Sequence, residues 1–79
     1  MGLLDDMADD IAQLALADEA KTGDDKIVDE IAAILGTSSQ TLEEAYKTAI
    51  RVRRAEKRAR ALLAERARKR KSAQAPTDG

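Results

Sequence analysis

The chain of 79 residues contains no cysteine and no histidine, which removes the commonest chemical tools of active sites. Without cysteine there is neither a disulfide nor a thiolate metal ligand, and without histidine the usual general base is missing. Carboxylates are plentiful, but Asp24, Asp25 and Lys26 do not follow the alternating pattern of a calcium-binding loop. We therefore expect a protein that is not an enzyme and that binds no metal ion and no cofactor.

Residue types that favour strands are also scarce. Tyr46 is the single aromatic residue, and the chain has two valines, one proline and four glycines, against sixteen alanines and 37% charged residues. Such a composition cannot fill one face of a sheet, whereas alanine and long charged residues favour helices. The composition predicts an all-α fold.

Long apolar runs are missing as well. No stretch approaches the roughly 18 apolar residues of a membrane-spanning helix. The first residues, Met-Gly-Leu-Leu-Asp-Asp, are acidic where a signal peptide is basic. We expect a cytoplasmic protein without membrane contact.

The apolar residues that are present recur at helical spacing in three segments, residues 2–20, 25–35 and 39–71. Gly36 is expected to end the second helix in a left-handed conformation. Thr37, Ser38 and Ser39 are candidate N-caps of the third helix, and residues 37–40 and 41–44 both fit a capping box. The predicted apolar face of the first helix consists of Leu4, Met7, Ile11, Leu14 and Ala15.

Nearly all large apolar residues lie in the first two thirds of the chain. Of seventeen such residues after the initiator Met, fifteen lie at or before Val52. We therefore predict two short acidic helices packed on the first half of a long basic third helix, with a compact part over residues 2–55. Residues 56–71 are expected to project as a basic helix, and residues 72–79 to form a disordered tail.

Charge divides the chain into two poles. The first 30 residues contain ten carboxylates and two lysines, whereas residues 50–71 contain eleven Lys and Arg and two acids, Glu56 and Glu65. Such asymmetry indicates a charged partner, either a nucleic acid or an oppositely charged protein, or a second copy of the same chain.

The segment from residue 31 to residue 45 contains a small residue, a glycine four positions later and an aliphatic residue six positions beyond that, namely Ala32, Gly36 and Leu42. It resembles the helix-turn-helix of bacterial and phage DNA-binding proteins. The resemblance implies that Ser39 and Gln40 contact bases. With the long helix that follows, the layout also resembles the small terminase subunits of phages, which recognise viral DNA for packaging. The alternative is a capped helix corner with no DNA role.

The basic half of the third helix predicts contacts to phosphates, because its charges surround the helix without interleaved aromatics that would stack on single-stranded bases. The alternative is that these arginines cover an alanine stripe and pair with acids of the first helix of another subunit. The predicted phosphate contacts are Arg51, Arg53, Arg54, Lys57, Arg58 and Arg60.

A single core of this size supplies little net stability, so we expect a homo-oligomer. The interface is expected along an alanine-rich stripe of the third helix; the alternative for this stripe is the helix propensity of a solvated rod. The predicted interface residues are Ala45, Ala49, Val52, Ala59, Leu62 and Leu63.

Three functions compete. The sequence favours an oligomeric nucleic-acid-binding protein, either of the small-terminase type in DNA packaging or a transcriptional regulator. The second hypothesis is a small acidic inhibitor that imitates nucleic acid and binds a basic protein surface. The third is a helical scaffold or assembly protein whose two poles drive association.

Overall fold

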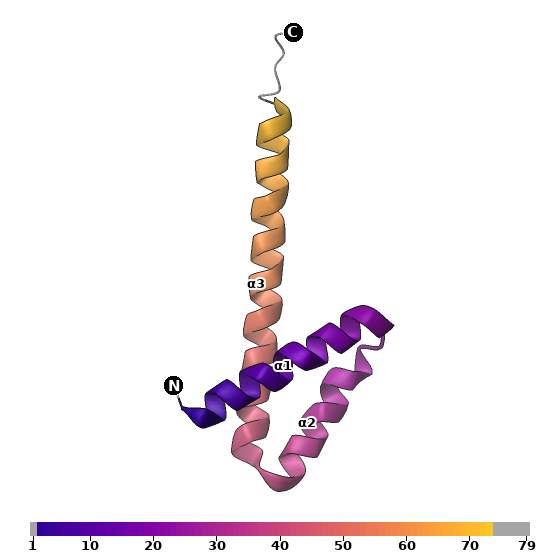
Figure 1. Ribbon diagram of the computed structural model, residues 1–79, viewed down its shortest axis with the longest axis vertical. Coiled ribbons are helices and arrows are strands. Elements are labelled where there is room, and N and C mark those ends of the chain that lie inside the picture. The colour runs from indigo at the N-terminus through magenta and orange to yellow at the C-terminus, as the bar shows by residue number, and fades with distance from the viewer. Residues whose placement is uncertain (1, 74–79) are drawn as a thin grey trace.

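The computed structural model describes residues 2–73, which form three helices and no strand. These helices are α1 (Leu3–Thr22), α2 (Lys26–Ser38) and α3 (Gln40–Ala73). The all-α prediction is confirmed. In Figure 1, α2 and the first half of α3 form a V, and α1 crosses α3 and meets the open end of α2 as the third side of a triangle. The second half of α3 extends beyond this triangle, so that the molecule measures 63 Å along its longest axis.

The turn between α1 and α2 is made by a glycine and two side chains. Gly23 has the left-handed backbone conformation, with φ of 77°, and its N–H donates to the Glu19 carbonyl. The Thr22 hydroxyl accepts from the Asp24 N–H, and the Asp24 carboxylate accepts from the Lys26 N–H at 2.9 Å. The turn therefore satisfies backbone groups that both helix ends would otherwise leave unpaired.

The prediction for Gly36 is wrong. α2 continues past Gly36 to Ser38, and within residues 2–73 only Gly23 has a positive φ. A Cβ at position 36 would lie 2.5 Å from the Glu43 carboxylate, so the glycine leaves room for α3 where the two helices converge. The glycine on which the helix-turn-helix resemblance depends is therefore inside a helix and not in a turn.

A single extended residue, Ser39, connects α2 to α3. Its hydroxyl accepts from the Leu42 N–H at 3.1 Å, which confirms Ser39, one of the three candidates, as the N-cap of α3. The predicted capping boxes that begin at Thr37 and Thr41 do not supply this cap. At the other end α3 runs to Ala73, so the first two residues of the predicted tail, Ser72 and Ala73, are helical. The rest of that predicted tail, residues 74–79, lies outside the described residues.

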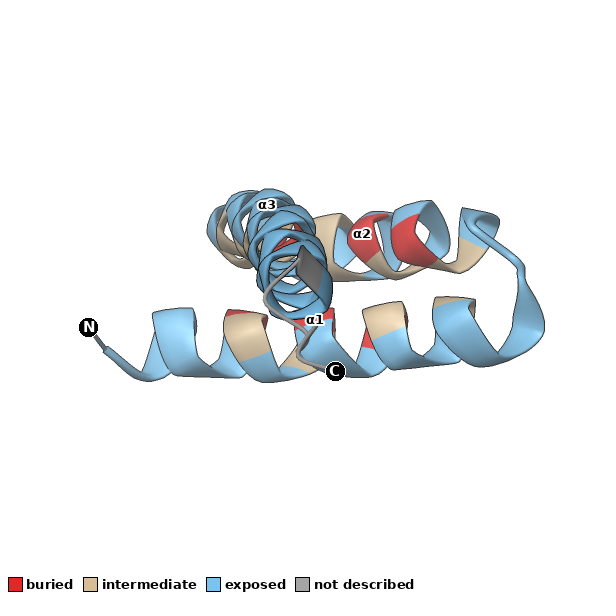
Figure 2. Cartoon of the chain, turned by 90° about the horizontal axis from the view of Figure 1, so that it is seen from above, coloured by how far each residue is buried: buried red, intermediate tan, exposed pale blue. Residues whose placement is uncertain are grey.

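The core is built largely from small side chains. The buried residues form one cluster, which consists of Ala8, Ala12, Ala15, Val28, Ala32, Tyr46 and Ile50. The three residues that α1 contributes to it are all alanines. Figure 2 shows the buried positions of α1 on the side that faces α2 and α3. The predicted apolar face of the first helix is therefore wrong in part, because Leu14 is 70% exposed and Met7 41%. Alanine allows α1 to lie close to its neighbours, which larger side chains would prevent.

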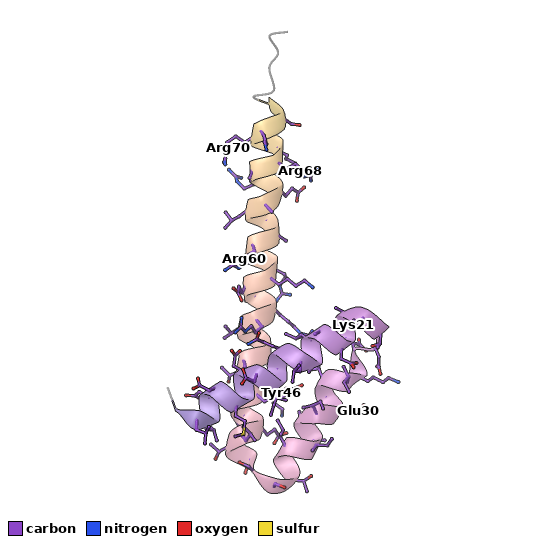
Figure 3. The ribbon with its side chains drawn as sticks, viewed as in Figure 1. Lys21, Glu30, Tyr46, Arg60, Arg68 and Arg70 are labelled. Carbon is purple, nitrogen blue, oxygen red and sulfur yellow. The ribbon has the colours of Figure 1, made fainter. Side chains whose placement is uncertain are left out.

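Tyr46 lies where the three helices meet (Figure 3) and is fully buried. Its hydroxyl donates to the Val28 carbonyl at 2.8 Å, which ties α3 to α2. Burial, and to a smaller extent the nearby Asp29 carboxylate, raises the pKa of the Tyr46 phenol above its ordinary value. The neutral hydroxyl is thus the form that the folded core favours.

Candidate nucleic-acid interface

The second half of α3 extends away from the rest of the chain. Every residue from 57 to 72 is exposed, and we call this stretch the projecting segment. Its single acid is Glu65, against eight cations: Lys57, Arg58, Arg60, Arg66, Arg68, Lys69, Arg70 and Lys71. The last two lie in the final turns of the helix, where cations interact favourably with the helix dipole.

Helical geometry sorts these cations by side. At about 100° per residue, the cations at positions 57, 60, 68 and 71 fall on one side of the helix, which we call the basic face. The opposite side carries Ala59, Leu62, Leu63, Arg66 and Arg70, which we call the leucine face. In Figure 3 Arg68 and Arg70 point to opposite sides of α3. The charge surrounds the helix, as predicted, whereas the two large apolar side chains, Leu62 and Leu63, lie on one side of it.

Few charges of the projecting segment are paired. Arg60 pairs with Glu56 at 2.9 Å, and Glu65 pairs with Lys69 at 3.7 Å and with Arg68 at 4.0 Å. These pairs lie three or four residues apart on an exposed helix and each stabilises it by only about 0.2–0.5 kcal/mol. The segment therefore retains a strong positive excess that no other part of the described chain neutralises.

Arg53 and Arg54 have a different role, because both are bound to α1. Arg53 donates from Nε and Nη2 to the two carboxylate oxygens of Asp9, at 2.8 and 2.6 Å, in a bidentate pair. This pair raises the pKa of Arg53 and lowers that of Asp9. Arg54 Nη2 lies 3.3 Å from Glu19 Oε2. The sequence suggested such pairing with α1 of another subunit; the structure shows it within one chain.

A crevice of about 160 Å³ lies beside these pairs, between α1 and α3. Lys57, at the start of the projecting segment, lines it together with Arg53 and Arg54. The Nε atom of Arg54 is buried there without a hydrogen-bond partner. The crevice is thus the point where the structural arginines meet the free cations of the projecting segment.

The other predicted contacts lie elsewhere. Gln40 precedes Arg60 by twenty residues, so roughly 30 Å of helix separates them at 1.5 Å per residue. The Ser39 hydroxyl caps α3, and Arg51 lines a crevice between α2 and α3. The structure therefore places Lys57, Arg58 and Arg60 together in the projecting segment, with Lys57 and Arg60 on its basic face, and places Ser39, Gln40 and Arg51 outside that segment.

The predicted phosphate contacts cover only part of the projecting segment. They stop at Arg60, whereas the projecting segment carries five further cations: Arg66, Arg68, Lys69, Arg70 and Lys71. The signal that could have included them is the charge run itself, which continues to residue 71 without a helix breaker. They belong to the same exposed helix as Lys57, Arg58 and Arg60.

The predicted interface stripe is split between two environments. Ala45 and Ala49 pack against the chain's own core, whereas Ala59 is exposed, as are Val52, Leu62 and Leu63, at 59%, 59% and 66%. Ala45 and Leu63 are eighteen residues apart, which is about five helical turns, so they lie on the same side of α3. That side is covered by the chain's own core at Ala45 and Ala49 and is exposed from residue 57 onward.

Compared with known proteins, the chain matches no family model, no curated protein sequence and no solved structure. Within residues 2–73, no helix has both the length and the apolarity that crossing a membrane requires. In the same residues, no group of three or more acidic side chains is arranged to hold a metal ion. The function must therefore be argued from the charge and geometry of the helices.

Proposed function

We propose that this is a non-enzymatic, oligomeric DNA-binding protein whose projecting segment contacts the phosphates of duplex DNA. The observation that carries the proposal is the segment itself, a helix with eight cations and one acid that is exposed along its whole length in the described chain. Cations that neutralise phosphates release condensed counterions, which supplies affinity without sequence information.

The basic face suits close approach to a duplex. Three alanines, Ala61, Ala64 and Ala67, lie between its cations, so no bulky side chain keeps the helix away from the DNA. The major groove, about 12 Å wide, admits one α-helix. Alanine offers no hydrogen bond to base edges, and the projecting segment contains no Asn or Gln that would read adenine. We therefore expect weak sequence preference.

The proposal includes the biological role that the sequence suggested, which is phage DNA packaging of the small-terminase type or transcriptional regulation. Both roles use oligomeric helical proteins that hold DNA. The position of Gly36 inside α2 gives this role no support from a helix-turn-helix, so it depends on the charge and shape of α3 alone.

The test is a matched pair of triple variants. Lys57→Gln, Arg60→Gln and Arg68→Gln remove three charges from the basic face, and Lys21→Gln, Lys26→Gln and Lys47→Gln remove three charges elsewhere. Arg53 and Arg54 are left intact because they hold α1. Affinity for a labelled duplex is measured by fluorescence anisotropy between ~50 and ~200 mM salt.

For the basic-face variant we expect weaker binding and a log–log salt slope that is less steep by about one for each phosphate-binding cation removed. The control variant should bind like the parent, with the parent's salt slope. Equal affinities and slopes for the two variants, or no duplex binding by the parent at ~50 mM salt, would overturn the proposal.

One observation favours the acidic-inhibitor alternative. Asp9 and Glu19 pair with arginines of α3, but α1, α2 and the turn between them also carry many exposed carboxylates. The exposed carboxylates that form no ion pair within residues 2–73 are Asp6, Asp10, Asp18, Asp24, Asp25, Asp29 and Glu30. An array of this kind could imitate the phosphates of a nucleic acid toward a basic protein. The two functions use opposite ends of the molecule, so they can be separated by mapping where a ligand binds.

A further inference from the structure

An apolar surface lies along α1 and α2, away from α3. A groove of about 230 Å³ is lined by Ile11, Leu14, Ala15, Asp18, Ile27 and Ile31, with no contribution from α3. Leu14 and the nearby α2 residue Ile34 are 70% and 65% exposed. A contiguous surface of large aliphatic side chains, edged by charge, is typical of an interaction site.

We propose that this groove receives the leucine face of the projecting segment of a second copy of the chain. The inference rests on the oligomeric part of the proposed function and names its interface. Each chain then contributes one groove and one projecting segment. In a dimer with a twofold axis, each groove binds the segment of the other chain, so that both grooves are occupied.

Charge selects this occupant. The groove is edged by acids of α1, with Asp18 in its lining and Asp10 in the adjoining hollow beside Leu14. The leucine face carries Arg66 and Arg70 next to its apolar residues. Two grooves packed face to face would instead place the acids of both copies together, which opposes association.

The dimensions of the groove and the exposure of the projecting segment also favour this occupant. The part of α1 that lines the groove, residues 11–18, is about 10 Å long, and the stretch of the leucine face from Leu62 to Arg66 is about 6 Å long, so these side chains fit within the groove. A helix of this length is only marginally stable in water without packing. Covering Leu62 and Leu63 therefore removes from water the largest apolar side chains of a segment that its own chain leaves bare.

The two proposals use different sides of one helix. Docking buries the leucine face, with Leu62 and Leu63, and leaves the basic face outward for phosphates. The dimer would place two basic faces on one particle, which increases the number of phosphate contacts and strengthens the salt dependence of binding.

The absence of native cysteine allows a direct test with single-cysteine variants. Leu14→Cys marks the groove, Leu63→Cys marks the leucine face, and Gln13→Cys marks an exposed position of α1 that does not line the groove. Each variant is treated with a short bismaleimide cross-linker, alone and in equimolar mixtures. We expect cross-linked dimers mainly in the mixture of Leu14→Cys with Leu63→Cys.

Other patterns contradict the inference. Dimers of Leu14→Cys alone indicate groove-to-groove pairing, and dimers of Leu63→Cys alone indicate pairing of two α3 helices. Equal yields with Leu14→Cys and Gln13→Cys as partners of Leu63→Cys indicate random collision. A measured mass of 8.6 kDa for the full chain across micromolar concentrations would likewise overturn the inference.

A second measurement does not depend on the reach of the cross-linker. Leu14→Glu should lower the mass in light scattering from a dimer to a monomer, and Gln13→Glu should remain a dimer. Leu14 is too exposed for its replacement to unfold the chain. If the mass does not fall but the basic-face variant still loses DNA affinity, this interface is wrong and the proposed DNA-binding surface stands.

Discussion

The two halves of α3 belong to one continuous helix but are held in different ways. The first half contributes Tyr46 and Ile50 to the core and binds α1 through Arg53 and Arg54. The second half is exposed at every residue from 57 to 72 and depends on helix propensity, a few exposed ion pairs and favourable charge at its end. Packing determines the first half, whereas local preference determines the second.

The comparison also separates arginines that composition cannot distinguish. Arg53 is bound to Asp9 by two short hydrogen bonds from another helix, so it serves structure. Arg60, seven residues later, is 78% exposed, and its one ion pair within residues 2–73 is with Glu56 of its own helix. A phosphate can replace the partner of Arg60 at little cost, whereas removing Asp9 from Arg53 would loosen α1.

The largest expected difference between the two halves comes from proline substitutions. Proline inside a helix costs about 3 kcal/mol or more, because it removes a backbone hydrogen bond and clashes with the preceding turn. Ala49→Pro should therefore unfold the compact end. Ala61→Pro should shorten α3 and leave the unfolding of the compact end nearly unchanged.

Both prolines can be followed by the fluorescence of Tyr46 during urea unfolding, because Tyr46 is the single aromatic residue and is buried in the compact end. Circular dichroism reports the loss of helix in each variant, and dilute samples keep association out of the comparison. A destabilisation by Ala61→Pro as large as that by Ala49→Pro would show that the projecting segment packs on the core.

A smaller effect is expected at the glycines of the compact end. Gly23→Ala forces a left-handed conformation on an L-residue and should cost about 1–2 kcal/mol of unfolding free energy. Gly36→Ala should stabilise by about 0.5 kcal/mol, because the gain in helix propensity exceeds the cost of moving the flexible Glu43 carboxylate away from the new Cβ. The two variants are compared by urea midpoints. Equal shifts of the same sign would mean that the helix boundaries are misplaced.

The smallest effect concerns acid. The folded-state pKa of Asp9 lies below its unfolded value of about 3.9, so the contribution of the pair to stability is present above about pH 4 and is lost as the pH falls through the folded pKa. The stability difference between the parent and Asp9→Asn should therefore shrink below pH ~4. Asp10→Asn, at an exposed residue without an ion pair in the described chain, is the control. A difference that is constant with pH would assign Arg53 no structural role.

The sequence predicted the parts that depend on local pattern. Three helices, the break between residues 20 and 25 and an unbroken basic helix follow from apolar spacing and from the lack of a helix breaker in the third segment. The predictions that failed concern side chains whose packing depends on residues that are close in space but belong to another helix. The alanine face of α1 was missed because a hydrophobic scale ranks Leu14 above Ala12, whereas close helix packing favours the smaller residue. Gly36 resembled a cap because its proximity to Glu43 is invisible without the fold.

For the candidate site, the sequence identified the basic residues but not which of them are bound to α1 and which are exposed. Arg53 and Lys57 stand four residues apart in one basic run, and only the position of Asp9 in space shows that the first is bound to α1. The split of the alanine stripe likewise could not be predicted, because it depends on how far along α3 the helices α1 and α2 extend. Residues with the same chemistry thus acquire different roles from neighbours that are distant in sequence.

The central claim is that the projecting segment, and neither the acidic end nor the corner at Ser39, is the DNA-binding surface. The most direct measurement is a titration of the isotope-labelled chain with a short duplex, followed by the chemical shifts of its backbone amides. Our account predicts that the largest shifts occur from Lys57 to Lys71, while α1 and α2 change little. Largest shifts around Ser39 and Gln40 or within α1 and α2, or no shifts at all, would contradict it.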